Sequence, residues 1–129
     1  MTKPPDCKPR SIGTVCMSSD RTQTRLRDIV DNADWIAEYL GGSDLRQFLQ
    51  DRMVADAVER CIERIAEAIV QIGEATSAEI GIAVPWHDVR NLGNRLRHEY
   101  RRIDRSVIYE TARDDVPALR AAALRALAD

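Results

Sequence analysis

The chain has 129 residues, of which 44% are hydrophobic and 31% are charged, with only 6 glycines and 5 prolines. This length suits one domain with a sizeable core, and the composition excludes collagen-like, low-complexity and wholly disordered chains. The net charge of −2 argues against a globally basic nucleic-acid binder but leaves a local basic patch open. No uncharged apolar run approaches the ~18–20 residues that span a bilayer, so we expect no integral membrane protein. Three cysteines without C-x-x-C spacing predict neither a disulfide framework nor a zinc site, which favours a cytoplasmic protein.

Residues 1–19 hold three of the five prolines and show no apolar periodicity. They also lack the apolar segment of a signal peptide. We expect a mobile tail here, within which Met17 is an alternative start of the chain. The single folded domain is then predicted over residues 20–129.

From Asp20 onward, apolar residues recur at the spacing of one helix face. They predict a first helix that ends at the glycine pair beginning with Gly41, because glycine accepts the left-handed conformation after a helix. A short second helix over Asp44–Leu49 and a long third helix over Arg52–Thr76 follow. Cys61 lies inside the apolar stripe of the third helix, so we expect a buried structural thiol.

The next segment, Ser77–Pro85, contains glycine and proline and predicts a loop. A fourth helix should begin near Trp86. Its apolar positions are Val89, Leu92, Leu96, Tyr100 and Ile103.

The chain is expected to bend near Asp104 and to enter a last helix that runs to about Leu127. Pro117 should kink this helix or restart it, with Asp114 or Asp115 as the cap, because proline has no N–H for the helical hydrogen bond. No segment alternates with period two. The predicted fold class is therefore all-α, an antiparallel helical bundle of about five helices.

The segment Trp86–Arg105 carries the candidate chemistry. On a helical wheel of about 100° per residue, six polar side chains fall within about 60° of His98 if the helix continues to Arg105. They are Asn91, Asn94, Arg95, Arg101, Arg102 and Arg105. Guanidiniums bind phosphate, and a histidine gives or takes a proton near neutral pH, so this face could cut RNA without metal through attack by the ribose 2′-hydroxyl. A solvated arginine-rich face with an incidental histidine is the alternative.

Three separated motifs resemble the HepT-like proteins of the HEPN superfamily. They are Pro85-Trp86-x-Asp88-Val89 with Asn94-Arg95-Leu96-x-His98-x-Tyr100-x-x-Ile103-Asp104, then Asp115-Val116-Pro117-x-Leu119, and Phe48-Leu49-x-Asp51 with Asp56-Ala57-Val58-Glu59-Arg60. The resemblance implies a homodimer in which the signature helices of two copies face one another across a cleft. It also implies a ribonuclease toxin whose partner, a nucleotidyltransferase antitoxin, transfers AMP from ATP to Tyr100. The helical wheel places Tyr100 on the core-facing half, so a tyrosine packed in the core, with a hydrogen-bonded hydroxyl, is an equally good expectation as a modified one.

The same resemblance assigns roles to the polar residues. His98 is expected to be the general acid/base and Asn94 to position phosphate or imidazole. Arg95, which is not part of the family's pattern, and Arg102 are expected to supply charge. The candidates for contact with RNA phosphate are Arg90, Arg101, Arg102 and Arg105. The motif arginine of the family aligns with Gly93. Arg95, on the same face as His98, is a better substitute than Arg90.

Gly93 keeps two further classes of function open: a catalytically inactive helical partner, and an RNA-binding module that does not cut. Gly93→Arg should create or raise RNA cleavage if the rest of the site is intact. We expect no cofactor and no metal, since His87 and His98 would lie roughly 16 Å apart along one helix and could not share an ion.

Overall fold

The computed structural model describes residues 20–129, with Tyr100 described by its backbone alone. No strand occurs in this range, which confirms the all-α class for the described residues. The segment 1–19, predicted as a tail, lies outside them. The elements are α1 (Asp20–Leu40), α2 (Leu45–Gln50), α3 (Arg52–Ile72), α4 (Glu74–Glu79), α5 (Trp86–His98), the 3-10 turn η3 (Tyr100–Arg102), α6 (Arg105–Glu110), the π-helical η4 (Thr111–Asp115) and α7 (Val116–Ala128).

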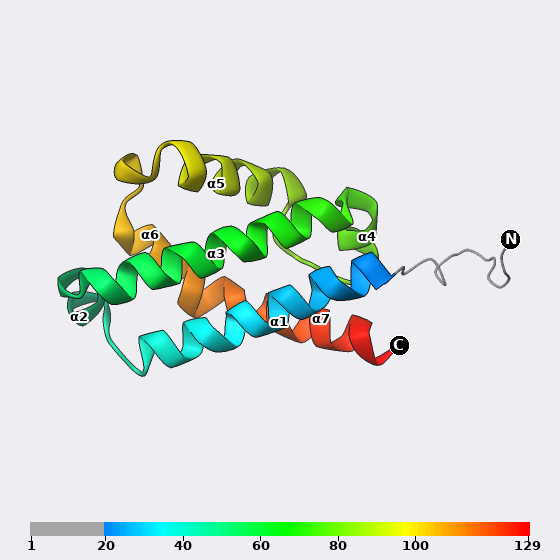
Figure 1. Cartoon of the computed structure of the whole chain (residues 1–129), viewed down its shortest axis with the longest axis horizontal. Coiled ribbons are helices and arrows are strands. Elements are labelled where there is room, and N and C mark those ends of the chain that lie inside the picture. The colour runs from blue at the N-terminus through cyan, green and yellow to red at the C-terminus, as the bar shows by residue number, and fades with distance from the viewer. Residues whose placement is uncertain (1–19) are drawn as a thin grey trace, which may run out of the picture.

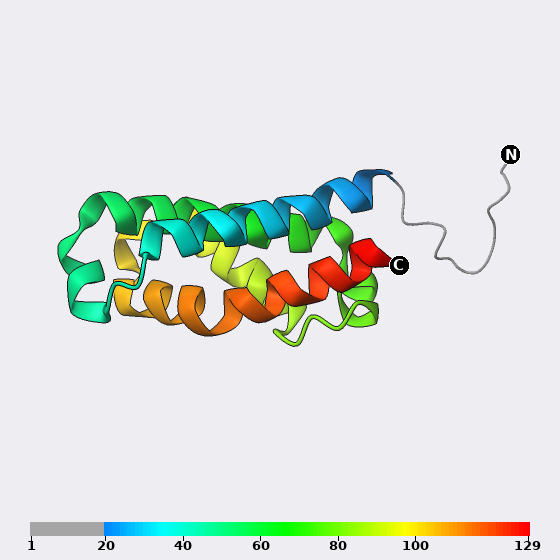
Figure 2. The same cartoon turned by 90° about the horizontal axis from the view of Figure 1, so that it is seen from below.

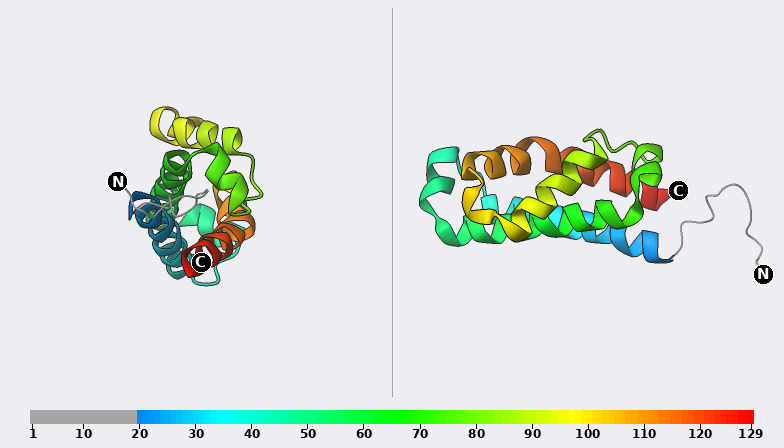
Figure 3. Two further views of the ribbon diagram at one scale, coloured as in Figure 1. Left: turned by 90° about the vertical axis from the view of Figure 1, so that its right-hand side faces the viewer. Right: turned by 90° about the horizontal axis from the view of Figure 1, so that it is seen from above.

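Helices α1 and α3 lie antiparallel along each other at the centre of the bundle (Figure 1). Helix α7 packs along α1, and Figure 2 shows α6, η4 and α7 following one another in a single rod below these two helices. Helix α5 packs chiefly on α3, and the end view of Figure 3 shows it at the edge of the bundle. The structure thus consists of a packed core to which α5 is added on one side.

The core is built from the apolar stripes that the sequence predicts. Ile29 and Ile36 of α1 and Val58 and Ile69 of α3 are fully buried. Burial of each such side chain contributes about 1.5–3 kcal/mol. Cys61 is buried among them as predicted, and this burial raises the pKa of its thiol.

Helix α2 closes one end of the bundle. A capping box starts it: the Asp44 carboxylate accepts from the Gln47 N–H at 2.8 Å, and the Gln47 amide oxygen accepts from the Asp44 N–H at 2.9 Å. Phe48 is fully buried with its ring centroid 5.3 Å from that of Tyr109. The Tyr109 hydroxyl donates to the Ser43 carbonyl at 2.8 Å, so α6 is held against this end.

The boundary after α3 differs from the prediction. The long helix ends at Ile72 rather than Thr76, because Gly73 takes a φ of +90° that an L side chain rarely adopts. The chain then forms α4 over Glu74–Glu79, part of which was predicted as loop. The apolar stripe itself ends at Ile72, and periodicity alone did not show that a separate short helix follows Gly73.

A separate helix, α7, starts at Val116 with Pro117 in its first turn, as the predicted restart requires, but no side chain caps it. Asp115 has helical backbone angles, and its side chain makes no cap hydrogen bond. Instead the chain widens into the π-helical turn η4, where the Val116 N–H donates to the Thr111 carbonyl five residues back. This wider turn accommodates Pro117, which lacks an N–H and would crowd the carbonyl four residues before it. Across residues 20–129, no helix combines the length and apolar character needed to cross a membrane.

Candidate functional site

Helix α5 carries most of the candidate residues, and one narrow edge attaches it to α3. Val89, Gly93 and Leu96 are buried on this edge. At the start of the helix the Trp86 indole N–H donates to the Ile69 carbonyl of α3 at 3.2 Å. Trp86 and Leu92 are partly buried against the core beside this edge, and the polar residues of α5 lie on its outward side.

The outward face holds the predicted polar set from this helix. Asn91, Asn94, Arg95 and His98 are all exposed, and so is Arg90 on one flank. Within the described residues Arg90 and Arg95 have no ion pair or side-chain hydrogen bond. The structure thus confirms one shared face for this part of the set, and a single chain leaves that face open to solvent.

The helix does not continue to Arg105, and this part of the prediction is wrong. It ends at His98, where Glu99 takes φ −136° and ψ 30° and donates its N–H to the Arg95 carbonyl at 2.7 Å. The Asp104 carboxylate accepts from the Ser106 N–H at 2.9 Å and caps α6, and this hydrogen bond lowers the pKa of Asp104. Because a new helix starts soon after His98, the residues from Trp86 to Arg105 do not belong to one continuous helix, and a single helical wheel does not describe them.

Arg101 and Arg102 lie near His98 although they are not on the same helix. The 3-10 turn η3 closes through a hydrogen bond from the Arg102 N–H to the Glu99 carbonyl at 2.8 Å. This turn brings Arg101 and Arg102 to the end of α5, where an open hollow of about 380 Å³ is lined by them with His98 and Glu99. An imidazole and two guanidiniums therefore border one space.

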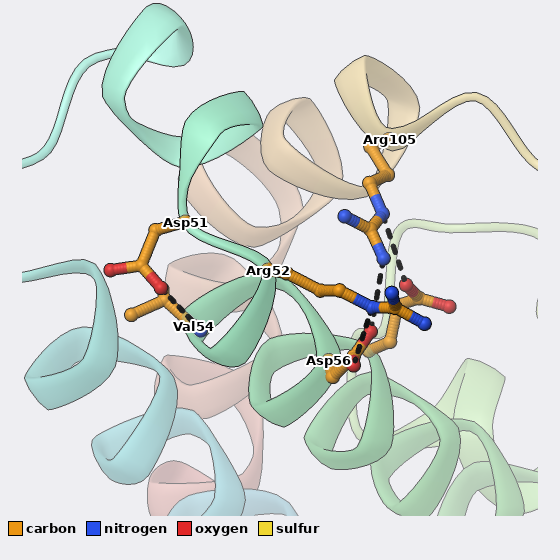
Figure 4. A network of polar contacts seen from close by, with 6 residues as sticks. Asp51, Arg52, Val54, Asp56 and Arg105 are labelled. Carbon is orange, nitrogen blue, oxygen red and sulfur yellow. Dashed lines mark hydrogen bonds and ion pairs between the residues drawn. The ribbon is translucent and has the colours of Figure 1, made fainter.

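Arg105 lies elsewhere. Its guanidinium is 3.0 Å from an Asp56 carboxylate oxygen and 3.9 Å from a Glu59 carboxylate oxygen, both on α3 (Figure 4). Arg52 lies 3.8 Å from the same Asp56. Burial raises the pKa of Glu59, and the charge of Arg105 opposes that rise. Arg105 thus ties the start of α6 to α3, and its predicted contact with RNA phosphate stays a prediction.

Arg97 is a residue that the sequence reasoning missed. Its Nη2 donates to the Asn94 amide oxygen at 2.6 Å, and its Nη1 lies 3.4 Å from a Glu67 carboxylate oxygen on α3. The spacing of three between Asn94 and Arg97 places them on neighbouring turns and could have indicated the first contact. The contact with Glu67 joins residues thirty positions apart, and no sequence pattern indicates it.

His87 stays apart from His98, at the opposite end of α5. Its Nε2 lies 3.7 Å from a Glu74 carboxylate oxygen. Among the described residues, no three His, Cys, Asp or Glu side chains form a group that could hold a metal ion. The side chain of Tyr100 lies outside the description, so its predicted placement is not tested.

Gly93 is buried where α5 and α3 meet. A Cβ atom at this position would lie 3.3 Å from the Ala66 Cβ and 3.7 Å from the Arg97 Nη1. The glycine serves close packing here, since its φ is not positive. A side chain at position 93 would therefore need Ala66 to move by a few tenths of an ångström, and Gly93→Arg tests packing as well as chemistry.

We predict that Gly93→Arg lowers the free energy of unfolding by about 1–3 kcal/mol, because the added atoms overpack the contact with Ala66. Gly93→Ala should gain less than the roughly 1 kcal/mol that alanine gains over glycine at an open helix position. Urea denaturation followed by circular dichroism measures both. Adding Ala66→Gly should recover part of the loss in Gly93→Arg. A Gly93→Arg protein as stable as the natural chain would contradict the packing argument.

Comparison with known proteins places the chain in a family. A family model described as "Ribonuclease HepT-like" matches residues 29–126. The protein named "Putative RNase MJ1380" of Methanocaldococcus jannaschii is 30% identical over 104 residues, which cover 81% of this chain and 94% of that protein. "Probable ribonuclease HepT" of Thermococcus cleftensis is 28% identical over 95 residues, covering 74% of this chain and 86% of that protein. No solved structure gives a significant match. The extent of the family match and the identity to these relatives show that the chain belongs to the HepT-like ribonuclease family.

Proposed function

We propose that this chain is a metal-independent endoribonuclease and the toxin of a toxin–antitoxin pair. The observation that carries the proposal is the hollow at the end of α5, where His98 lies with Arg101 and Arg102 in a chain of the HepT-like family. A proton-transfer group and two permanent cations beside one open space suit a phosphodiester.

The proposed reaction uses the RNA's own 2′-hydroxyl as the nucleophile. The 2′-oxygen forms a bond to the adjacent phosphorus, and the bond from phosphorus to the 5′-oxygen of the next nucleotide breaks. His98 takes the proton of the 2′-hydroxyl, and a protonated imidazole gives one to the leaving 5′-oxygen. Asn94 and Arg95 on the same face, with Arg102, stabilise the doubly charged phosphorane.

The open outer face of α5 supports the proposal of a homodimer. In one chain, His98 and Asn94 are exposed on a helix that packs on one side only. Two copies with these faces opposed would enclose the phosphate and place two imidazoles in one cleft, one to accept a proton and one to donate it. Two-fold symmetry makes such a surface self-complementary.

The antitoxin partner is proposed to be a nucleotidyltransferase that silences the site through Tyr100. In that reaction the Tyr100 phenol oxygen bonds to the α-phosphorus of ATP, pyrophosphate leaves and the phenol proton is released. Tyr100 begins η3, next to the two arginines of the hollow. An AMP group there would put a phosphate among these cations and obstruct RNA.

One observation favours the second candidate, a catalytically inactive helical partner. Gly93, at the position of the motif arginine, is buried against Ala66 and carries no charge. Loss of a preorganised charge at a developing oxyanion costs about 10²–10³-fold in rate. The cleavage assay below separates the two candidates.

We predict that the purified chain cleaves RNA in EDTA and that His98→Ala lowers the rate by at least about 10²-fold, because proton transfer is lost. His87→Ala is the matched control, since His87 lies at the other end of the same helix beside Glu74. It should keep the full rate. A folded natural chain that cleaves no RNA would favour the inactive partner.

For assembly, we predict a two-chain mass in light scattering at micromolar concentration, because the exposed polar face needs a second copy to form a closed cleft. The mass should not change when His98→Ala is measured. A one-chain mass would contradict the shared cleft.

For modification, we predict that a cognate nucleotidyltransferase with ATP adds one AMP to the peptide that contains Tyr100, as measured by mass spectrometry. Tyr100→Phe should abolish the addition, since the phenol oxygen is the acceptor. Tyr39→Phe, at an exposed tyrosine of α1, should leave it intact. AMP found at another residue would overturn the assignment to Tyr100.

A further inference from the structure

Arg97 bridges α3 and the outer face of α5. It lines an open groove together with residues of α1 and α3, among them Glu67. Its guanidinium contacts Asn94 at 2.6 Å through Nη2 and Glu67 at 3.4 Å through Nη1. The side chain is about one-third exposed, so it is partly sheltered by the groove wall.

The Arg97 guanidinium lies close to Gly93. Long side chains on a helix lean toward its N-terminus, so Arg97 reaches back over the preceding turn. Its Nη1 lies 3.7 Å from the point where a Cβ of residue 93 would stand. An alanine at 93 would make an ordinary van der Waals contact with the guanidinium, whereas a long side chain there would compete with it for space.

The contact fixes which way the Asn94 amide faces. A guanidinium has only donors, so the atom of Asn94 that meets it must be the oxygen. The amide NH₂ of Asn94 is then directed away from Arg97, and among the described residues no group accepts from it. His98 lies one turn further along the same face, within reach of a common ligand.

We propose that Arg97 is a positioning residue of the ribonuclease site. It holds the amide oxygen of Asn94, with Glu67 as its anchor on α3, and thereby presents the Asn94 NH₂ as a donor to the phosphate beside His98. This inference rests on the proposed function, because it deepens the role of Asn94 in that site. In this proposal the Arg97 guanidinium orients the side chain of Asn94, the residue that follows Gly93.

A double-mutant cycle tests the positioning role. Arg97→Ala should lower kcat for RNA cleavage by up to about 10²-fold with little change in KM, because it acts through the orientation of Asn94. The variant Arg97→Ala with Asn94→Ala should be no slower than Asn94→Ala alone. Losses that multiply in the double variant would overturn the proposal, since Arg97 would then act on RNA by itself.

Arg120→Ala is the matched control. It also removes an exposed arginine that bonds across two helices, from Arg120 Nε to Asp34 at 2.7 Å. It should keep the natural kcat. Urea denaturation of all variants separates a loss of stability from a loss of positioning.

A second readout does not depend on activity. In ¹H–¹⁵N spectra of the free protein, the pair of Asn94 NH₂ signals is assigned as the pair that disappears in Asn94→Ala. Arg97→Ala should shift this pair, whereas Arg120→Ala should leave it in place. An unshifted pair in Arg97→Ala overturns the inference even if RNA is cut. A natural chain that cuts no RNA but shows the shift retains the Arg97–Asn94 contact and counts against the proposed function alone.

Discussion

The close contact of Gly93 with Ala66 sets the geometry on which the candidate site depends. It lets α5 lie near α3 along a narrow edge completed by Val89 and Leu96. Because α5 packs chiefly on α3, its polar residues off that edge, Asn91, Asn94, Arg95 and His98, are exposed. The polar face of α5 is thus a consequence of one-sided packing. Two hydrogen bonds to α3 fix the orientation of the segment from Trp86 to Arg105. The Trp86 indole N–H donates to the Ile69 carbonyl, and the Arg105 guanidinium donates to the Asp56 carboxylate.

The core of the bundle could be predicted from the sequence because it depends on local periodicity. Residues such as Ile29, Val58 and Cys61 repeat at the spacing of one helix face, and the structure buries each of them. The ends of the helices were harder to predict from the sequence. Helix α3 ends at Gly73 through a positive φ, and α5 ends where Glu99 leaves the helical conformation. The spacing of apolar residues carries no information about either of these helix ends.

The site was predictable in its local part only. Asn94, Arg95 and His98 share a face because they belong to one helix, and that much follows from 3.6 residues per turn. Arg101 and Arg102 reach His98 through a 3-10 turn, so the predicted neighbourhood holds while the predicted continuous helix does not. Arg105, by contrast, is turned to carboxylates on α3, which depends on tertiary packing. A sequence pattern specifies neighbours on one helix far better than contacts between helices.

The lack of a charged side chain at position 93 also affects where positive charge can come from on this face. A glycine inside a helix costs about 1 kcal/mol relative to alanine, and here a guanidinium from the next turn lies close to it. That guanidinium bonds to Asn94, so a cation adjoins this amide although none is attached at residue 93. Its other partner, Glu67, forms a partly exposed pair at 3.4 Å, and such pairs contribute at most about 1 kcal/mol. Glu67 therefore adds little to stability, and its part in the proposed site is to anchor the Arg97 guanidinium that holds Asn94. The position of a charge in space, more than its position in the motif, determines what this face can bind.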